Sequence, residues 1–316
     1  MMKDFIKVCK QTQKNLKNML AQFLKNNGYA PIVGDGFIYA PGVEPVCVTA
    51  HMDTVHKETV KDVVIENGDT ISSPQGIGGD DRCGVYMIME MVKQRIYPTI
   101  LFCEDEEIGG VGSDKFIRTE HFKDLKGRVK FFIELDRMHD TDLVYYDDDN
   151  KEFHNWCAKI TGYKTSYGSF SDISNLCPDA GISGVNISCG YYHAHTLDEC
   201  VVFSEMEASL KATIKLIEAA RELEKAWEYK EYVYPKYTTS YYSWNRRSFS
   251  TTYVFITLDG ATYVADGATE EEAVGNLMMD NPNLRWNDVV DWYNEDDFYN
   301  YGLDSWYDNY DARGVM

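Results

Sequence analysis

The sequence predicts an α/β fold: a mostly parallel central sheet with helices on both faces, followed by a small C-terminal ββα appendage. Two observations support this. Short apolar runs that indicate buried strands alternate with segments of helical periodicity, the pattern of a parallel sheet covered on both sides. The composition then changes near residue 230, where Tyr and Ser become frequent and no clear period remains.

The elements of the main domain follow from apolar spacing and from helix start and stop signals. Gly28 should end the first helix, and Ser204 with Glu207 forms an expected capping box for the last. The expected strands are 45–51, 98–104, 129–136 and 183–189, and the expected helices are 4–27, 81–94, 113–125, 171–179 and 204–229.

The chain is expected to divide into a domain at 1–229, a linker at 230–250 and an appendage at 251–316. Within the appendage, apolar runs at 253–257 and 262–265 flank Asp259-Gly260, which is a hairpin signal. Thr269 and Glu272 are the expected cap of a following helix. The acidic, aromatic tail from Asn281 is expected to be partly ordered, with its aromatic side chains as packing anchors.

Charge and composition exclude several classes of partner. The net charge is −20 and the sequence pI is about 4.7, which disfavours binding to nucleic acid or to an anionic membrane surface. No apolar run approaches the roughly 18 residues of a membrane span, and the polar N-terminus lacks the core of a signal peptide. The 8 cysteines form no CxxC pair, so buried, reduced thiols and a cytoplasmic location are expected. The oligomeric state stays open.

Two motifs in the first hundred residues contain possible metal ligands. His51 ends the apolar run 46–50, and Asp53 is well spaced to fix the orientation of its ring. Taken alone, His51 would more often be a core residue than a ligand. Asp80 and Asp81 follow a glycine-rich turn before a helix, where they could cap the helix or direct a carboxylate inward.

Three further polar clusters follow apolar runs. Glu104–Glu107 comes after the strand at 98–104, where a solvated acidic loop is the ordinary alternative to a site. Ligand sites in open α/β sheets lie at the carboxyl ends of strands, and two adjacent acids there suit one metal ligand and one proton acceptor. Asp136 ends the next strand, and either His193 or His195 could be a ligand. Together, two histidines and three carboxylates suit two divalent ions, most plausibly zinc, with cobalt or manganese as alternatives.

These motifs resemble those of the di-zinc aminopeptidase/carboxypeptidase superfamily, which includes peptidase T and leucyl aminopeptidase-like zinc exopeptidases. The resemblance covers about residues 1–228. HMDTV resembles the HxD motif of the family, GGDDRCGV its G-[AG]-D-D-x-x-G motif, and DEEIGGVGS its EE-x-G-x-x-GS motif. HTLDE resembles the terminal H-[ST]-x-x-[DE] motif, which favours His195 over His193.

The resemblance implies a role for each residue. Asp80 would bridge the two metals, and its peptide bond to Asp81 would be cis. His51 and Asp136 would complete one metal site, and Glu107 and His195 the other. The resemblance further implies that Glu106 is the general base and that Asp53 orients His51.

The sequence departs from many members of the family in one respect. Those members insert a lid or dimerisation domain between the last two motifs, and residues 137–194 are too few to hold one. The compact branch is therefore favoured, and Ser171-Asp172-Ile173 also resembles a segment of it. The expected activity is that of an aminopeptidase acting on short peptides. A carboxypeptidase or N-acyl amide hydrolase, with Arg137 as a carboxylate clamp, and an inactive peptidase-like binding protein are the alternatives.

Overall fold

The computed structural model describes residues 2–232, 251–257, 262–267, 270–281, 284 and 289–294. The chain divides into two compact units, residues 1–232 and 233–316, and each is described by itself. In the described part of the chain, no helix is both long and apolar enough to cross a membrane.

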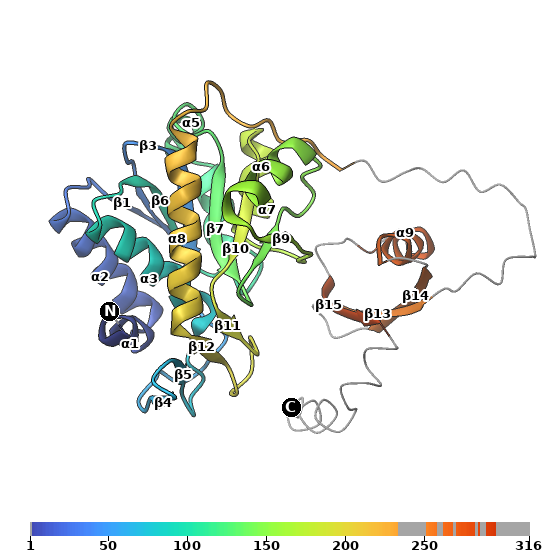
Figure 1. Cartoon of the computed structure of the whole chain (residues 1–316), viewed down its shortest axis with the longest axis horizontal. Helices are drawn as coiled ribbons and strands as arrows, with labels where there is room; N and C mark the ends of the chain where they lie inside the picture. The colour runs from blue at the N-terminus through green and yellow to red at the C-terminus, as the bar shows by residue number, and fades with distance from the viewer. Residues whose placement is uncertain are drawn as a thin grey trace, which may run out of the picture. The chain divides into compact units, whose positions relative to one another are not determined.

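An eight-stranded sheet forms the centre of the first unit (Figure 1). Its inner strands β6, β3, β7 and β10 are parallel, and the antiparallel strands β2 and β8 flank them. The fold class is therefore the predicted one. In spatial order the strands are β1 (Ile32–Gly34), β2 (Phe37–Ala40), β6 (Pro98–Cys103), β3 (Glu44–His51), β7 (Phe132–Arg137), β10 (Gly184–Ser188), β8 (Asp142–Val144) and β9 (Lys164–Thr165).

Helices cover both faces of this sheet because its inner strands are apolar on both sides. In β6, Ile100 and Phe102 join one core while Leu101 and Cys103 join the other. The larger core includes apolar residues of α1 (Met2–Cys9), α2 (Gln13–Asn26), α3 (Gly79–Lys93), α6 (Lys151–Thr161) and α8 (Phe203–Ala220). The other core includes residues of α4 (Val111–Ile117), α5 (Glu120–Lys126) and α7 (Asp172–Ala180).

A small antiparallel sheet lies beside the start of α3. It consists of β11 (Tyr191–Tyr192), β12 (Cys200–Val202), β5 (Thr70–Ser72) and β4 (Val64–Glu66), in that order. A Cβ atom on Gly79 would come within 2.8 Å of the side chains of Tyr191 and Val201, so only glycine allows this close approach. The loop between β11 and β12, which carries His195, is thereby held near the start of α3.

Two expected helices are each divided in the structure. Residues 4–27 form α1 and α2, because Thr12 is extended (φ −69°, ψ 155°) and its hydroxyl accepts the N–H of Asn15 as an N-cap. Residues 113–125 fall into α4 and α5, with Thr119 extended between them. Both threonines are ordinary N-cap residues, and the continuous apolar spacing across them concealed the breaks.

The last helix of the first unit is shorter than expected, and its capping box is not formed. The helix α8 ends at Ala220, and Ser204 lies inside its first turn. The N–H and the hydroxyl of Ser204 both donate to the carboxylate of Asp69, at 2.8 and 2.6 Å. The start of α8 is thus held by an acid from the β4–β5 turn. The chain then stays with the first unit as far as Tyr232, three residues past the expected boundary.

The second unit contains one more strand than the expected ββα arrangement. Its sheet has the order β14 (Thr262–Gly267), β13 (Thr251–Thr257), β15 (Val289–Asn294), and α9 (Glu270–Asp280) shares its core. Residues 289–294 were expected to be part of the tail, but they pair with β13 in an antiparallel register. The expected turn at Asp259-Gly260, the cap at Thr269 and the linker from residue 233 lie outside the described residues.

Candidate metal centre

The motifs meet at the carboxyl end of the parallel strands. Strand β3 is parallel to β6 on one side and to β7 on the other, so the chain reverses its direction of winding at β3. Such a reversal opens a crevice at the strand ends, where ligands bind in α/β sheets. His51 is paired with Cys103 at the end of β6, and Asp136 stands two residues beyond Glu134, which is paired with Thr49.

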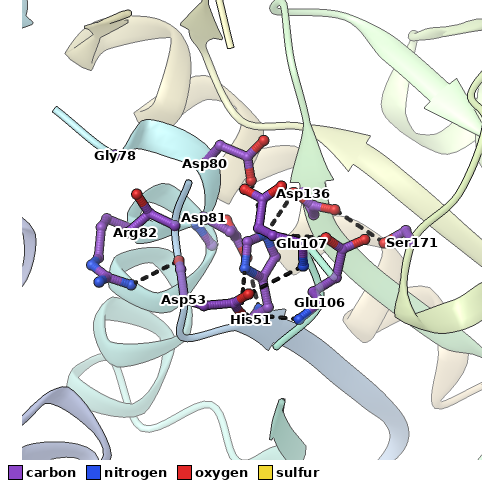
Figure 2. A network of polar contacts seen from close by, with 12 residues as sticks. His51, Asp53, Gly78, Asp80, Asp81, Arg82, Glu106, Glu107, Asp136 and Ser171 are labelled. Atoms are coloured by element: carbon purple, nitrogen blue, oxygen red, sulfur yellow. Dashed lines mark hydrogen bonds and ion pairs between the residues drawn. The ribbon is translucent and has the colours of Figure 1, made fainter. Parts of the chain in front are cut away.

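The first group of possible ligands is His51, Asp80 and Asp136. The Nε2 atom of His51 lies 2.8 Å from Oδ1 of Asp80 and 3.4 Å from Oδ1 of Asp136. The side chain of His51 is fully buried. Figure 2 shows the side chains of Asp80, Asp136 and Glu107 gathered around this histidine.

The second group is Asp80, Glu107 and His195. The Nε2 atom of His195 lies 3.3 Å from Oδ2 of Asp80 and 3.0 Å from Oε2 of Glu107. The side chain of His195 is 55% exposed, so this group faces solvent. Asp80 belongs to both groups: its Oδ1 faces His51 of the first group, and its Oδ2 faces His195 of the second. His193 is also exposed, but it belongs to neither group.

The start of α3 places Asp80 between the two histidines. Asp80 has non-helical backbone angles (φ −79°, ψ 104°), and the Asp80–Asp81 peptide bond is cis, as the resemblance implies. The carboxylate of Asp81 accepts the N–H of His51 at 3.1 Å and the N–H of Gly84 at 2.7 Å. Asp81 thus takes the capping role that the sequence left open and also fixes the end of β3.

Glu199 also holds the backbone of the glycine turn that precedes Asp81. Its carboxylate accepts the N–H of Gly78 at 2.8 Å and the N–H of Asp80 at 3.0 Å. The Nε2 atom of His56 lies 2.6 Å from the same side chain. Sequence reasoning noticed Glu199 only as the last letter of the HTLDE motif and gave it no role. The positions of the glycine turn and of the β11–β12 loop therefore depend on one buried acid.

Asp53 connects the first histidine with the acidic loop. Its Oδ1 lies 3.1 Å from Nδ1 of His51, and its two oxygens accept the N–H groups of Glu106 and Glu107, each at 3.1 Å. The carboxylate of Glu106 lies 4.0 Å from Nε2 of His51. Glu106 therefore stands beside the first group of ligands without belonging to either group.

Three residues that the sequence analysis did not assign to the site fix Asp136. Ser171 donates its hydroxyl to Oδ2 of Asp136 at 3.1 Å, and Figure 2 shows this contact. Tyr191 donates its hydroxyl to the backbone oxygen of Asp136 at 3.0 Å. The backbone N–H of Asp136 donates to Oδ1 of Asn186 at 2.9 Å. Only Ser171 carried a sequence signal, as part of the segment that resembles the compact branch.

The two arginines near the motifs have other partners. The guanidinium of Arg82, which follows Asp81 in the GGDDRCGV motif, donates to the backbone oxygens of Met52, Asp53 and Gln11. It thus supports the backbone beside His51. The Nε and Nη2 atoms of Arg137 lie 3.3 and 3.2 Å from a carboxylate oxygen of Asp142.

Burial, hydrogen bonds and neighbouring charges shift the pKa of Glu106, Asp136 and His195. Burial raises the pKa of Glu106 well above its ordinary range; His51 opposes this effect and Asp136 adds to it. Burial also raises the pKa of Asp136, to about 7, and the charge of Asp80 adds to it. Hydrogen bonds with Asp80 and Glu107 raise the pKa of His195 to about 11. Divalent cations would stabilise the charged carboxylates and displace the histidine protons.

The residues fit two divalent ions. In each group, one atom of each ligand lies within 4.8 Å of the others. Oε1 of Glu107 is buried and has no hydrogen-bond partner, as expected for an atom that a cation would contact. Nitrogen and carboxylate oxygen are common ligands of zinc, cobalt and manganese.

No protein-family model matches the sequence, and no curated protein sequence does either. Solved structures do match. The aminopeptidase PepT from Bacillus cereus matches with a TM-score of 0.57 at 16% identity, and the match covers 70% of this chain and 98% of the PepT chain. A tripeptidase from Staphylococcus aureus has a TM-score of 0.56 at 14% identity, covering 70% and 98%. An aminopeptidase from the archaeon Desulfurococcus kamchatkensis has a TM-score of 0.53 at 12% identity, covering 69% and 95%.

These likenesses and the eight-stranded sheet agree with the resemblance found in the sequence motifs. Every residue between Asp136 and His195 is described, and all of them belong to the first unit, so no lid domain is inserted there. Over about 70% of its length, the chain shares its α/β fold with these solved peptidase structures.

Proposed function

We propose that the first unit is a two-metal exopeptidase that releases N-terminal residues from short peptides. The observation that carries this proposal is the sharing of Asp80 between two groups of ligands, which suits a pair of adjacent ions. His51, Asp80 and Asp136 would hold one ion, and Asp80, Glu107 and His195 the other. The solved structures with this fold are themselves named as peptidases.

In the proposed reaction, the ions, Glu106 and Asp53 would each have a separate role. Bound divalent ions would lower the pKa of a water molecule and polarise the scissile carbonyl group. Glu106 would accept the proton of that water and pass it to the leaving amine. Its carboxylate lies 4.0 Å from Nε2 of His51, and its surroundings are largely dry, since the residue is only 9% exposed. Asp53 would keep Nδ1 of His51 protonated, so that Nε2 faces the ion.

Charge favours recognition of the amino end of the substrate. A free N-terminus has a pKa near 8, and nearby carboxylates favour its charged form. Glu106 and Glu107 supply such carboxylates at the site, whereas Glu104 and Asp105 contact Lys17 and Gln13 of α2. A carboxypeptidase would instead need a cation for the substrate carboxylate, but Arg137 is paired with Asp142 and Arg82 is buried against backbone oxygens. These contacts support an aminopeptidase.

The test uses one tripeptide in three forms: unmodified, N-acetylated and C-amidated. We expect stepwise release of N-terminal residues from the unmodified and amidated forms, and little cleavage of the acetylated form. Mass spectrometry of the products identifies the end that is attacked. Loss of activity on amidation, with tolerance of acetylation, would indicate a carboxypeptidase. No cleavage of any form by a metal-loaded protein would support a binding role.

We also propose a reducing compartment, the cytoplasm, as the place of action. All eight cysteines are unpaired, and seven of them are buried. Buried free thiols are typical of cytosolic proteins. Mass spectrometry of the protein from cells, alkylated without prior reduction, should therefore find every cysteine as a thiol.

A further inference from the structure

The loop 104–107 carries Glu106 and Glu107 in a conformation that other contacts must maintain. Asp105 has a φ of +61°, in the left-handed region that residues with a side chain seldom adopt. The following turn uses positive φ at Gly109 and Gly110. Four consecutive acids also repel one another. The loop therefore depends on its neighbours for both its shape and its charge balance.

The placement of Glu106 depends on the backbone of this loop. Among the described residues, no hydrogen bond holds its carboxylate, and the nearest ionisable nitrogen is Nε2 of His51 at 4.0 Å. On the side of the sheet, Asp53 accepts the backbone N–H groups of Glu106 and Glu107. A shift of the loop would therefore move the carboxylate of Glu106, because no hydrogen bond fixes the position of that carboxylate.

On its outer side the loop is held by α2. Nε2 of Gln13 donates to Oδ1 of Asp105 at 3.0 Å. Nζ of Lys17 donates to the carboxylate of Glu104, and also to the backbone oxygen of Gly34 at 2.9 Å. Gln13 and Lys17 are four residues apart in one helix, so their side chains lie on the same face of it.

The helix α2 is a firm support for these contacts. Its apolar residues Leu16, Leu20 and Leu24 are fully buried in the larger core. The side chains of Lys17 and Glu104 are only 15% and 17% exposed, so water screens their attraction less than on an open surface. Lys17 thus brings a positive charge to a run of four acids.

We propose that Gln13 and Lys17 are positioning residues that hold the 104–107 loop from outside, so that Glu106 faces the metal centre. The effect on the reaction rate rests on the function proposed above, whereas the effect on the loop does not. Neither residue contacts a member of the two ligand groups, and both would act through the backbone of the loop.

The first test measures the loop itself, by hydrogen–deuterium exchange of the segment 104–112. The variants are Lys17→Met, Gln13→Ala and the double variant. The control is Lys7→Met, which removes an exposed ion pair with Asp4 from the neighbouring helix α1. We expect faster exchange in the loop for the three variants and unchanged exchange for the control. Unchanged exchange in the double variant would overturn the proposal.

The second test measures the reaction. Lys17→Met should lower kcat about tenfold or more, because small misplacements of a catalytic group are costly. Metal content and KM should stay within about twofold. Lys17→Arg should restore most of the rate, because it can still pair with Glu104. Faster exchange without any change in kcat would mean that the contacts stabilise the loop without positioning Glu106.

A double-mutant cycle separates positioning from a general loss of stability. In the background of Glu106→Gln, Lys17→Met should cost little further rate, because the group that it positions is already disabled. A full additive loss would contradict the proposed role. If exchange changes as expected but the unmodified protein cleaves no peptide, the role of α2 in holding the loop stands and the proposed function fails.

Discussion

Asp53 and His51 form the contact on which the first ligand group depends: Oδ1 of Asp53 lies 3.1 Å from Nδ1 of His51. The same carboxylate accepts the backbone N–H groups of Glu106 and Glu107. One side chain just beyond the end of β3 therefore contacts the possible ligand His51 and also holds the loop that carries the proposed base. Asp53 is only 8% exposed, so water cannot readily replace these contacts.

Asp53→Asn should weaken metal binding and activity together, by about ten- to a hundredfold. An amide has a single acceptor oxygen, so one of the three donors would face an NH₂ group. Metal titration against a chelator and steady-state kinetics measure the two effects. Asp62→Asn, at an exposed position, is the control. Normal metal affinity in Asp53→Asn would show that His51 does not need this partner.

Glu106→Gln should abolish turnover while metal content stays near two ions per chain. The substitution keeps the shape of the side chain and removes the proton acceptor, for which a loss on the order of a thousandfold is reasonable. Product formation and elemental analysis of the same sample give the two readings. Glu58→Gln, which changes an exposed acid, should behave like the unmodified protein. Retention of more than about a tenth of the activity would exclude Glu106 as the base.

His195→Ala should lower metal content toward one ion per chain, whereas His193→Ala should leave two. The reason is that His195 belongs to the second group of ligands only, and Asp80 and Asp136 still hold the first group with His51. Elemental analysis of both purified variants decides between them. The opposite result would assign the ligand to His193.

Much of the site was predictable because each motif follows an apolar strand, and parallel strands bring their carboxyl ends to one edge of the sheet. His51, Asp80, Glu107, Asp136 and His195 could thus be named together. The supporting contacts could not be predicted in the same way. Glu199 reaches Gly78 and His56 across more than 100 positions of sequence, and no local pattern reports such a contact.

The fold shows the same division between local and distant causes. The four inner strands of the large sheet followed from periodicity, but its short outer strands and the small sheet were not expected. The contact that holds the start of α8 could not be expected either, because Asp69 is 135 residues from Ser204 in sequence. The strand β15 was missed for a related reason. Its residues lie in an acidic, aromatic segment without clear alternation, and they become a strand by pairing with β13.

Truncation after Tyr232 should leave a folded first unit that binds two ions. Residues 230–232 pair with it: the N–H of Asp149 donates to the oxygen of Lys230 at 2.6 Å, and the N–H of Tyr232 donates to the oxygen of Asp147 at 2.8 Å. Truncation after Tyr229 removes these bonds and should lower the free energy of unfolding by about 2 kcal/mol. Urea denaturation of both fragments measures the difference.

An aggregated or metal-free fragment 1–232 would show that the second unit is needed to complete the first. Equal stability of the two fragments would show instead that residues 230–232 contribute nothing measurable.

The stability of the first unit should fall below neutral pH because of His154, which belongs to neither group of possible ligands. Its ring stacks on Tyr145 with a centroid distance of 3.7 Å, it is only 8% exposed, and its Nε2 has no hydrogen-bond partner. Burial lowers the pKa of His154 to about 4, and the charge of Lys151 adds to this effect. Protonation therefore favours the unfolded chain, where the pKa is about 6.5.

The neutral His154 contributes its full stability above about pH 6.5, and this contribution is lost as the pH falls toward 4. Between pH 7.5 and pH 5, the unmodified protein should therefore lose about 2 kcal/mol more than His154→Gln, which cannot be protonated in this range. Urea denaturation of the metal-free proteins at both pH values provides the measurement, and using metal-free protein keeps ligand release out of the comparison. The remaining acids titrate alike in both proteins, so the difference between them isolates His154. Parallel losses in the two proteins would mean that the histidine is already protonated, or hydrated, in the folded state.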